Sequence, residues 1–291
     1  MDTILVKALA KVNLGLDVLR RREDGYHEVR MIMQTIHLYD QLKIEKTEES
    51  GISISANLDF LPTDENNLIY KAAKLLMDTC DIKKGVAVEL QKHIPVAAGM
   101  AGGSTDAAAV LYGMNELFSL GLKRRDLMEL GVQIGADVPY CLMRGTALAE
   151  GIGEQLKSLP PMPKCPVLIA RPPIGVSTRF VYENLKLDRH TVHPNINAQL
   201  DALRRGNLKD VAKHMGNLLE TVTIPAYPVI DEIKRCMMDC GAINAMMSGS
   251  GPTVFGLFKD MHTAKEAYET MRDSKLAKQV YLTGIYNNRR V

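Results

Sequence analysis

Residues 94–118 read IPVAAGMAGGSTDAAAVLYGMNELF, and this stretch indicates the fold more strongly than any other. Its first half is rich in small and polar residues: Gly99, Gly102, Gly103, Ser104, Thr105 and Asp106. Its second half carries apolar residues at three- and four-residue spacing, typical of one helix face: Ala107, Val110, Leu111, Met114 and Leu117. A helix start presents unpaired amide N–H groups, and preceding glycines let the backbone approach an anion closely. We therefore expect a phosphate to bind where this loop enters its helix.

The glycine loop has a plainer interpretation, which the residues alone leave open. It is also compatible with a flexible turn in which Ser104 or Thr105 caps the helix. It is neither a Walker A loop, because no lysine follows the glycines, nor the dinucleotide motif GxGxxG. A second glycine-rich turn, SGSGPT at 248–253, is by itself more typical of a tight hairpin. Together the two loops favour a phosphorylated ligand held between two domains.

The composition is that of a globular protein with one or two domains, because 46% of its 291 residues are hydrophobic and 24% are charged. The net charge is +2, so neither nucleic acid nor a membrane surface is an expected partner. The five cysteines form no CxxC pair, which favours a reducing, cytoplasmic location. We expect no spanning helix, since no apolar stretch reaches 18 residues, and no signal peptide, since Lys7 and Lys11 interrupt the N-terminal segment.

Alternating polar and apolar residues predict a half-buried strand in the N-terminal segment. Its apolar positions from Val12 to Val18 would share the buried face, and Lys11 and Asn13 the uncovered one. The Asp-Gly pair within residues 21–27 then predicts a hairpin, with a second strand over 29–39.

Further elements follow from the same patterns along the chain. We expect strands over 42–46, 52–55 and 85–96, a capped helix within 62–80, a short helix over 122–135, and a loop followed by a strand over 135–153. Prolines between 160 and 166 predict a boundary between an N-terminal domain, 1–160, and a C-terminal domain, 161–291. Beyond it, strands at 166–171, 242–247, 252–258 and 279–286 and helices at 195–204, 207–219, 228–240 and 262–272 predict a second α+β layer.

Four segments resemble the GHMP small-molecule kinases in order and spacing: KALAKVNLGLDV at 7–18, PVAAGMAGGSTDAAA at 95–109, GADVPYCLMRGTALAEGIGE at 135–154 and MMSGSGPTVFG at 246–256. The combination of DGYH at 24–27 with GADVP resembles the branch that acts on a cytidyl diphosphate methylerythritol. The resemblance implies an α+β fold with a ribosomal-protein-like N-terminal domain, a ferredoxin-like C-terminal domain and the active site in the cleft between them. The implied reaction transfers phosphate from ATP to the 2-hydroxyl of this substrate, with release of ADP, in non-mevalonate isoprenoid biosynthesis.

The resemblance also implies the roles of individual residues. Lys11 and Asp137 would form the catalytic pair. The residues that would cradle the ATP phosphates are Pro95, Val96, Ala97, Ala98, Gly99, Met100, Ala101, Gly102, Gly103, Ser104 and Thr105. Those near the adenosine would be Asn66, Asn67 and Lys92, and those holding the substrate would be Asn13, Tyr26, His27 and Tyr182. Mg²⁺ would arrive with ATP, no separate metal site is expected, and the chain would be a monomer or a homodimer.

The loop departs from the family pattern at Ala97, Ala98 and Ala101, which replace residues that are often glycine. The chemistry of the other residues agrees with the implied roles. Phosphoryl transfer needs a carboxylate that accepts the hydroxyl proton and a nearby cation, and Asp137 and Lys11 supply these groups. Cytosine is a flat base with hydrogen-bond donors and acceptors on its edge. Its recognition therefore needs an aromatic face and a directional hydrogen bond.

Each of these residues also has a structural alternative. Asp137 would serve as an Asx turn or N-cap, Lys11 as a solvated lysine, His27 as a surface residue of the turn, and Tyr26 as a cap on an edge of the core. A GHMP kinase acting on a smaller alcohol is the nearest competing function, but it has no use for the DGYH hairpin. An RNA-binding protein is the competitor from another class, and the near-neutral charge argues against it.

Overall fold

The computed structural model describes residues 2–288, and the larger of its two sheets is built on a long hairpin. Strands β1 (Thr3–Arg21) and β2 (His27–Thr47) pair antiparallel over their whole length. On one side β2 pairs with β4 (Gly85–Gln91), which runs parallel to β3 (Ile52–Ala56). Further along, β2 also pairs with β5 (Thr146–Glu150), which is followed by β6 (Gln155–Ser158). Strand β2 of the hairpin thus pairs with β4 along one part of its length and with β5 along another.

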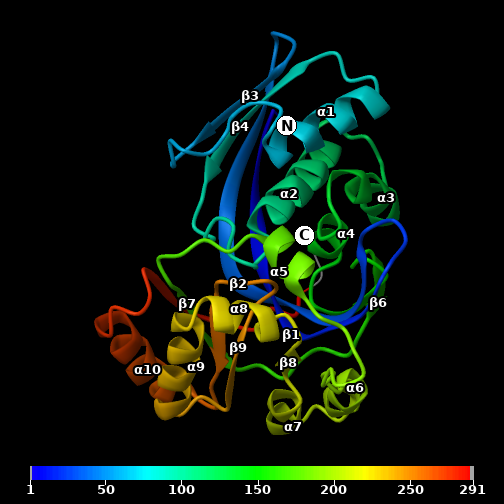
Figure 1. Cartoon of the computed structure of the whole chain (residues 1–291). Helices are drawn as coiled ribbons and strands as arrows, with labels where there is room; N and C mark the ends of the chain where they lie inside the picture. The colour runs from blue at the N-terminus through cyan, green and yellow to red at the C-terminus, as the bar shows by residue number, and fades with distance from the viewer. Residues whose placement is uncertain (1, 289–291) are drawn as a thin grey trace.

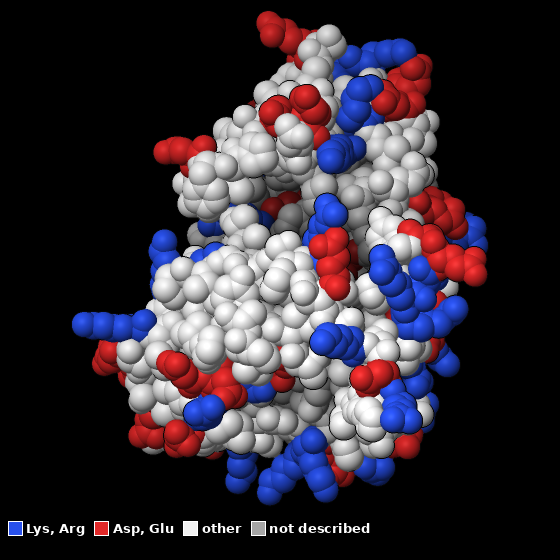
Figure 2. Space-filling view, in the orientation of Figure 1, with Lys and Arg blue, Asp and Glu red and all other residues white. Residues whose placement is uncertain are grey.

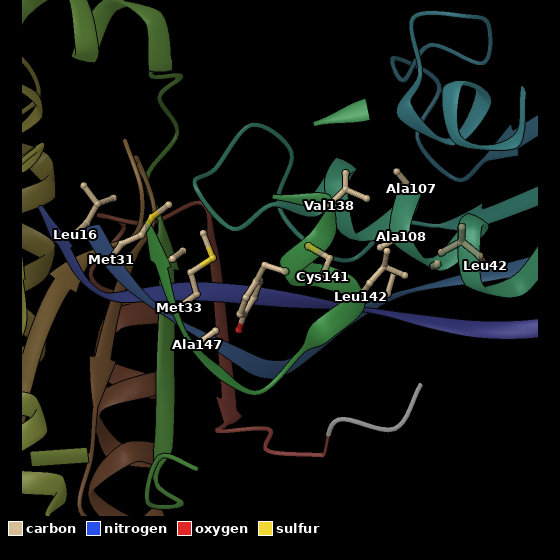
Figure 3. Packing of buried hydrophobic residues seen from close by; sticks show 14 of the residues in the cluster. Leu16, Met31, Met33, Leu42, Ala107, Ala108, Val138, Cys141, Leu142 and Ala147 are labelled. Carbon is tan, nitrogen blue, oxygen red and sulfur yellow. The ribbon is translucent and has the colours of Figure 1, made fainter. Parts of the chain in front are cut away.

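Four helices pack on one face of this hairpin (Figure 1): α1 (Leu68–Thr79), α2 (Gly102–Leu117), α3 (Arg124–Ile134) and α4 (Val138–Met143). Helix α2 lies closest to the sheet and contacts β1, β2 and the other three helices. Figure 3 shows the resulting core, where Met33 of β2, Ala108 of α2 and Leu142 of α4 are buried together. Full burial of each large apolar side chain contributes about 1.5 to 3 kcal/mol, so this core fixes α2 on the sheet.

Bulges in β1 change the face to which its side chains point. The β1–β2 register shifts between Leu9 and Lys11, and again between Asn13 and Gly15. The prediction that the apolar positions from 12 to 18 share one face is therefore wrong. Those at 12 and 14 join a core between the two sheets, and those at 16 and 18 join the core under the helices. The prediction of an uncovered face is also wrong, because Lys11 and Asn13 are buried.

The second sheet has the strand order β11-β7-β10-β9 and is antiparallel throughout. Its strands are β7 (Pro166–Arg171), β9 (Asn244–Met247), β10 (Val254–Leu257) and β11 (Gln279–Gly284). Helix α9 (Val229–Asp239) precedes β9, and helix α10 (Met261–Asp273) lies between β10 and β11. This β-α-β-β-α-β order is the ferredoxin-like arrangement.

A segment between β7 and α9 joins the two sheets. It contains α5 (Thr178–Asn184), α6 (Ile196–Arg204), α7 (Leu208–Lys213), β8 (Gly216–Asn217) and α8 (Glu220–Ala226). Strand β8 pairs parallel with β1, so the second half of the chain adds a strand to the first sheet. The core between the sheets holds Val12 and Ile32 from one side and Ile169 and Phe255 from the other. The two halves therefore pack against each other through a continuous apolar contact.

Most of the elements predicted from the sequence are confirmed, including the short strands at 52–55 and 166–171. The predicted strand at 42–46 is the end of β2, because a long strand with bulges looks like several short ones. The segment 135–145, predicted as a loop, contains α4, and the helix predicted over 207–219 ends at Lys213. Helices α5 and α8 and strands β6 and β8 were not predicted, since two to seven residues are too few for a periodic pattern.

The domain boundary stays a prediction. The proline-rich segment leads from β6 of the first sheet to β7 of the second, but β8 and the shared core cross the proposed division. Residues 1 and 289–291 of the two proposed domains lie outside the described residues. Within residues 2–288, none of the helices is both long and apolar enough to cross a membrane.

Candidate active site

A cleft of about 820 Å³ opens between the hairpin, the glycine loop and the second half of the chain. The residues predicted for the site that line it are Lys11, Asn13, Tyr26, His27, Ala97, Ala98, Gly99, Ala101, Gly102, Gly103, Ser104, Asp137 and Tyr182. They come from β1, the hairpin turn, the loop before α2, the start of α4 and helix α5. Tertiary folding thus collects in one cavity groups that are far apart in the sequence.

The loop before α2 has the backbone geometry of an anion-binding nest. Residues Ala97, Gly99 and Ala101 have φ angles of 50°, 74° and 57°, in the left-handed region. Alternation of left-handed residues with ordinary ones turns successive amide groups toward the same side. Helix α2 starts at Gly102, and its N-cap residue Ala101 forms no side-chain cap hydrogen bond. Because the cap position belongs to Ala101, neither Ser104 nor Thr105 caps this helix, and the first-turn amides face the cleft with the positive end of the helix dipole.

The glycine loop packs directly on the second glycine-rich turn, which is the predicted hairpin between β9 and β10. Ser248 Oγ donates a hydrogen bond of 2.9 Å to the carbonyl oxygen of Gly99. A Cβ atom on Gly99 would collide with the carbonyl oxygen of Ser248, and one on Gly249 would lie 3.2 Å from the Gly99 carbonyl oxygen. Glycine is therefore required at position 99 by close approach of the two backbones as well as by its φ angle.

Lys11 and Asp137 face each other across the floor of the cleft. Lys11 Nζ lies 3.6 Å from Asp137 Oδ2 and donates a 2.8 Å hydrogen bond to Asn13 Oδ1. The lysine side chain is 6% exposed and that of Asp137 is 30% exposed, so only the carboxylate is open to a ligand. Asn13 in turn donates to Met31 Sδ at 3.2 Å, which orients its amide.

Asp137 holds the N-cap position of α4 without capping it. Its φ and ψ angles of −82° and −15° are helical, and its side chain makes no cap hydrogen bond. The structural alternative of a capping aspartate therefore does not describe this residue. Its carboxylate is directed at Lys11, and such a pair can hold a hydroxyl group and accept its proton.

Aromatic rings from the hairpin and from α5 meet in the lining of the cleft. The rings of His27 and Tyr182 have centroids 5.1 Å apart and are tilted by 37°. Burial, together with the charge of Arg21, lowers the pKa of His27, which keeps the ring neutral. Burial, with the charge of Asp137 as a second cause, raises the pKa of Tyr182 to about 12. Tyr26 also lines the cleft but is 62% exposed, so its ring is free to move onto a ligand.

Comparison with known proteins gives two family matches. Residues 67–145 match the GHMP kinases N terminal domain, and residues 199–277 match the GHMP kinases C terminal domain. The chain belongs to the GHMP kinase family. The predicted α+β fold with its two GHMP kinase domains is thereby confirmed, and so is the prediction of an ATP-dependent kinase.

Relatives of this GHMP kinase share its full length. A protein of Lachnospira eligens named 4-diphosphocytidyl-2-C-methyl-D-erythritol kinase is 56% identical, covering 97% of this chain and 98% of that protein. A protein of the same name from Lachnoclostridium phytofermentans is 54% identical over the whole of both chains. The crystal structure of a 4-(cytidine 5'-diphospho)-2C-methyl-D-erythritol kinase superimposes with a TM-score of 0.84 at 33% identity, covering 98% of this chain and 100% of that one. A homoserine kinase from Cytophaga hutchinsonii shares the fold, with a TM-score of 0.82 at 21% identity, covering 100% of this chain and 96% of that one.

Several residues predicted for the nucleotide site lie outside the cleft lining of this GHMP kinase. Lys92 is buried, and its ammonium group binds Asp40 at 2.6 Å and Asp106 at 2.5 Å. This links β2, the segment after β4 and helix α2. The hydroxyl of Thr105 donates to the carbonyl oxygen of Leu9 at 2.8 Å, so it is engaged within the fold.

The other residues outside the lining support the loops around the site. Asn67 is the N-cap of α1 and accepts from the amide of Ile69. The preceding Asn66 bonds to Asp64 and is exposed. Met100 is buried, and its carbonyl oxygen accepts from the amide of Lys11. Pro95 and Val96 lead into the nest ahead of its first left-handed residue.

The structure adds cleft residues that sequence patterns did not indicate. Helix α5 contributes Thr178, Arg179 and Glu183, and Thr178 Oγ1 lies 2.8 Å from Ser250 Oγ. No sequence signal marked α5, because it spans only seven residues. The turn that carries Ser250 was indicated by its glycines.

Proposed function

We infer that this GHMP kinase transfers the γ-phosphoryl group of ATP to the 2-hydroxyl of 4-diphosphocytidyl-2-C-methyl-D-erythritol. The products are the 2-phosphate and ADP, in non-mevalonate isoprenoid precursor biosynthesis. The observation that carries this inference is the presence in one cleft of a phosphate nest, a lysine–carboxylate pair and an aromatic pair. Full-length relatives bearing the corresponding kinase name support the choice of acceptor.

The nucleotide phosphates rest against the amides of residues 97–104 in this proposal. The start of α2 adds its positive dipole end, and the Ser104 hydroxyl adds a donor on the cleft side. The predicted contacts of Asn66, Asn67 and Lys92 with the adenosine remain proposals, and the buried ion pairs of Lys92 favour an indirect role for it.

The acceptor hydroxyl lies between the nest and Asp137. The carboxylate takes the hydroxyl proton as the hydroxyl oxygen forms its bond to the γ-phosphorus, and the bond from that phosphorus to the β–γ bridging oxygen breaks to release ADP. Lys11 lies 3.6 Å from the Asp137 carboxylate and is fixed in turn by its hydrogen bond to Asn13. The transfer is direct, since an activated acceptor oxygen needs no covalent intermediate on the protein.

Mg²⁺ is proposed to enter with ATP, where it supplies neutralisation of phosphate charge. Mg²⁺ keeps most of its ligands as water and phosphate oxygens. The residues fit that mode through the Ser104 hydroxyl, which lines the cleft at the start of α2. Ser104 is the hydroxyl that lines the nest, since that of Thr105 is engaged by Leu9.

The cytosine is proposed to bind at the aromatic end of the cleft. A neutral His27 offers one ring nitrogen as donor and the other as acceptor, which matches the edge of a cytosine. Tyr182 and Tyr26, which both line the cleft, supply faces for stacking. The ring contact observed is that of His27 with Tyr182, so insertion of a base between Tyr26 and Tyr182 requires a small rearrangement.

Two competing functions are tested by the same experiment. The first is phosphorylation of a smaller alcohol, because a homoserine kinase has the same fold. At 21% identity this likeness concerns the fold alone. RNA binding is the second, and on the face in Figure 2 Lys and Arg are interspersed with Asp and Glu rather than gathered in a basic stripe. We further propose a cytoplasmic enzyme, monomer or homodimer, with free thiols at its five cysteines.

The test is a coupled ADP-release assay with the cytidyl substrate, mevalonate, homoserine and galactose as acceptors. We expect turnover with the cytidyl substrate at a kcat/KM at least about fivefold above the others, since base stacking alone contributes about 1 to 3 kcal/mol. Equal turnover of a small alcohol would refute the acceptor assignment, and ATP-independent RNA binding at nanomolar concentration would refute the kinase assignment.

A further inference from the structure

The end of β1 brings an uncompensated cation to the cleft. Three consecutive arginines stand here, and two of them have carboxylate partners. Arg20 lies 3.6 Å from Glu28, and Arg22 lies 2.9 Å from Asp24. Arg21 lines the cleft and forms no ion pair with any carboxylate in residues 2–288.

The other cations of the cleft lining are already matched. Lys11 faces Asp137, and Arg179 of α5 pairs with Glu183 at 2.7 Å. Both carboxylates also line the cleft, so each pair is locally neutral. Arg21 therefore supplies the excess positive charge of the cavity, and a polyanionic ligand is the natural partner of such a charge.

The position of Arg21 relates this charge to the aromatic end of the cleft. Arg21 is paired with His27 in the β1–β2 register, and its charge contributes to the lowered pKa of that ring. His27 contacts Tyr182, so Arg21 neighbours the aromatic pair in the cleft lining. The cation thus lies beside the proposed base site.

We propose that Arg21 binds the diphosphate of the acceptor and so selects acceptors that carry a nucleoside diphosphate. This inference rests on the proposed function, because it takes the cytosine to lie against His27 and Tyr182. A guanidinium can bind two phosphate oxygens with parallel N–H donors, which fits a diphosphate linker better than a neutral polyol. An acceptor without the diphosphate gains nothing from this contact.

The test compares Arg21→Gln with Arg20→Gln, which removes one positive charge from the neighbouring position outside the cleft lining. We expect Arg21→Gln to raise KM for the cytidyl substrate about tenfold, as loss of an exposed charge-assisted hydrogen bond does. KM for ATP and kcat should change less than about twofold. Arg20→Gln should leave all three constants unchanged, and Arg21→Lys should recover part of the loss.

A binding experiment separates the diphosphate from the base. Cytidine, CMP and CDP are titrated by calorimetry into the protein saturated with a nonhydrolysable ATP analogue. We expect CDP to bind more tightly than cytidine to the wild-type protein, and Arg21→Gln to weaken CDP binding while cytidine binding is unchanged.

These experiments distinguish failure of the role proposed for Arg21 from failure of the proposed function. If the wild-type protein does not phosphorylate the cytidyl substrate, the proposed function is wrong. If it does, and Arg21→Gln leaves KM for that substrate and the preference for CDP unchanged, only the role of Arg21 is overturned. A matching rise in KM for ATP would instead assign Arg21 to the nucleotide phosphates and would also overturn the proposal.

Discussion

The ammonium group of Lys11 lies 3.6 Å from the carboxylate of Asp137, although Lys11 belongs to a strand near the start of the chain and Asp137 is the N-cap residue of α4. Lys11 is nearly buried, whereas Asp137 is open to the cleft. This arrangement allows the carboxylate to touch a substrate while the buried lysine remains paired with it. The proposed proton transfer depends on that asymmetry.

Asp137→Asn is expected to lower kcat by about a hundredfold to ten-thousandfold, the range that general-base catalysis contributes. The amide keeps the shape of the side chain but cannot accept the hydroxyl proton. Affinity for a nonhydrolysable ATP analogue, measured by calorimetry, should change little because the nest is intact. Retention of full kcat would remove the base assignment.

Tyr26→Ala is expected to raise KM for the cytidyl substrate about fivefold or more, because stacking on a base contributes about 1 to 3 kcal/mol. The residue is 62% exposed, so folding should be unaffected. KM for ATP serves as the internal control and should hardly move. A parallel rise in both constants would point to a folding defect instead of a lost contact.

Gly99→Ala is expected to destabilise the protein and to raise KM for ATP. A Cβ at this position would collide with the Ser248 carbonyl oxygen and would also occupy a left-handed conformation. Gly25→Ala is the matched control, since Gly25 has a φ of 86° but a Cβ added there would have nothing within 4 Å. The control should lose about 1 kcal/mol in urea unfolding, the cost of a left-handed alanine. If both variants lose the same stability and Gly99→Ala keeps its KM, the contact between the two loops is unimportant.

Lys92→Met is expected to lose about 3 to 5 kcal/mol of unfolding free energy, the usual cost of leaving buried charge without its partner. Asp40 and Asp106 would then face each other without a cation. Asp106→Asn should cost much less, because burial raises the pKa of the Asp106 carboxyl well above its ordinary value. Urea unfolding of both variants at neutral pH provides the comparison. The reverse order of stabilities would contradict the raised pKa.

His27 is expected to titrate below the ordinary histidine value of about 6.5. Burial is the larger cause and the charge of Arg21 the smaller, so Arg21→Gln should raise the pKa of His27 toward its ordinary value. Below the folded pKa the ring becomes charged and loses its acceptor nitrogen, so KM for the cytidyl substrate should rise in acid and stay level near neutrality. An NMR titration, with a His27→Gln variant to assign the resonance, measures the shift. A pKa unchanged in Arg21→Gln would show that burial alone lowers it.

The sequence by itself determined the features that depend on a few neighbouring residues. Glycines before an apolar helical pattern indicated the nest at the start of α2, and the Asp-Gly pair indicated the hairpin turn, where Gly25 has a left-handed φ. The resemblance of four separate segments also indicated the family, which the comparisons confirm. Such signals are local because capping, turn formation and helical periodicity act within one or two turns of chain.

Only the tertiary structure decided which side chains meet. Alternation put Lys11 and Asn13 on an uncovered face, but that face is buried in the structure, where Lys11 meets Asp137. The bulge after Asn13 turns Leu16 and Val18 away from the core that holds Val12 and Leu14. The short helix α5, which has too few residues for a periodic pattern, brings Tyr182 onto His27. The direction of a side chain at a bulge and the docking of a short helix depend on partners distant in sequence, and no local pattern encodes those partners.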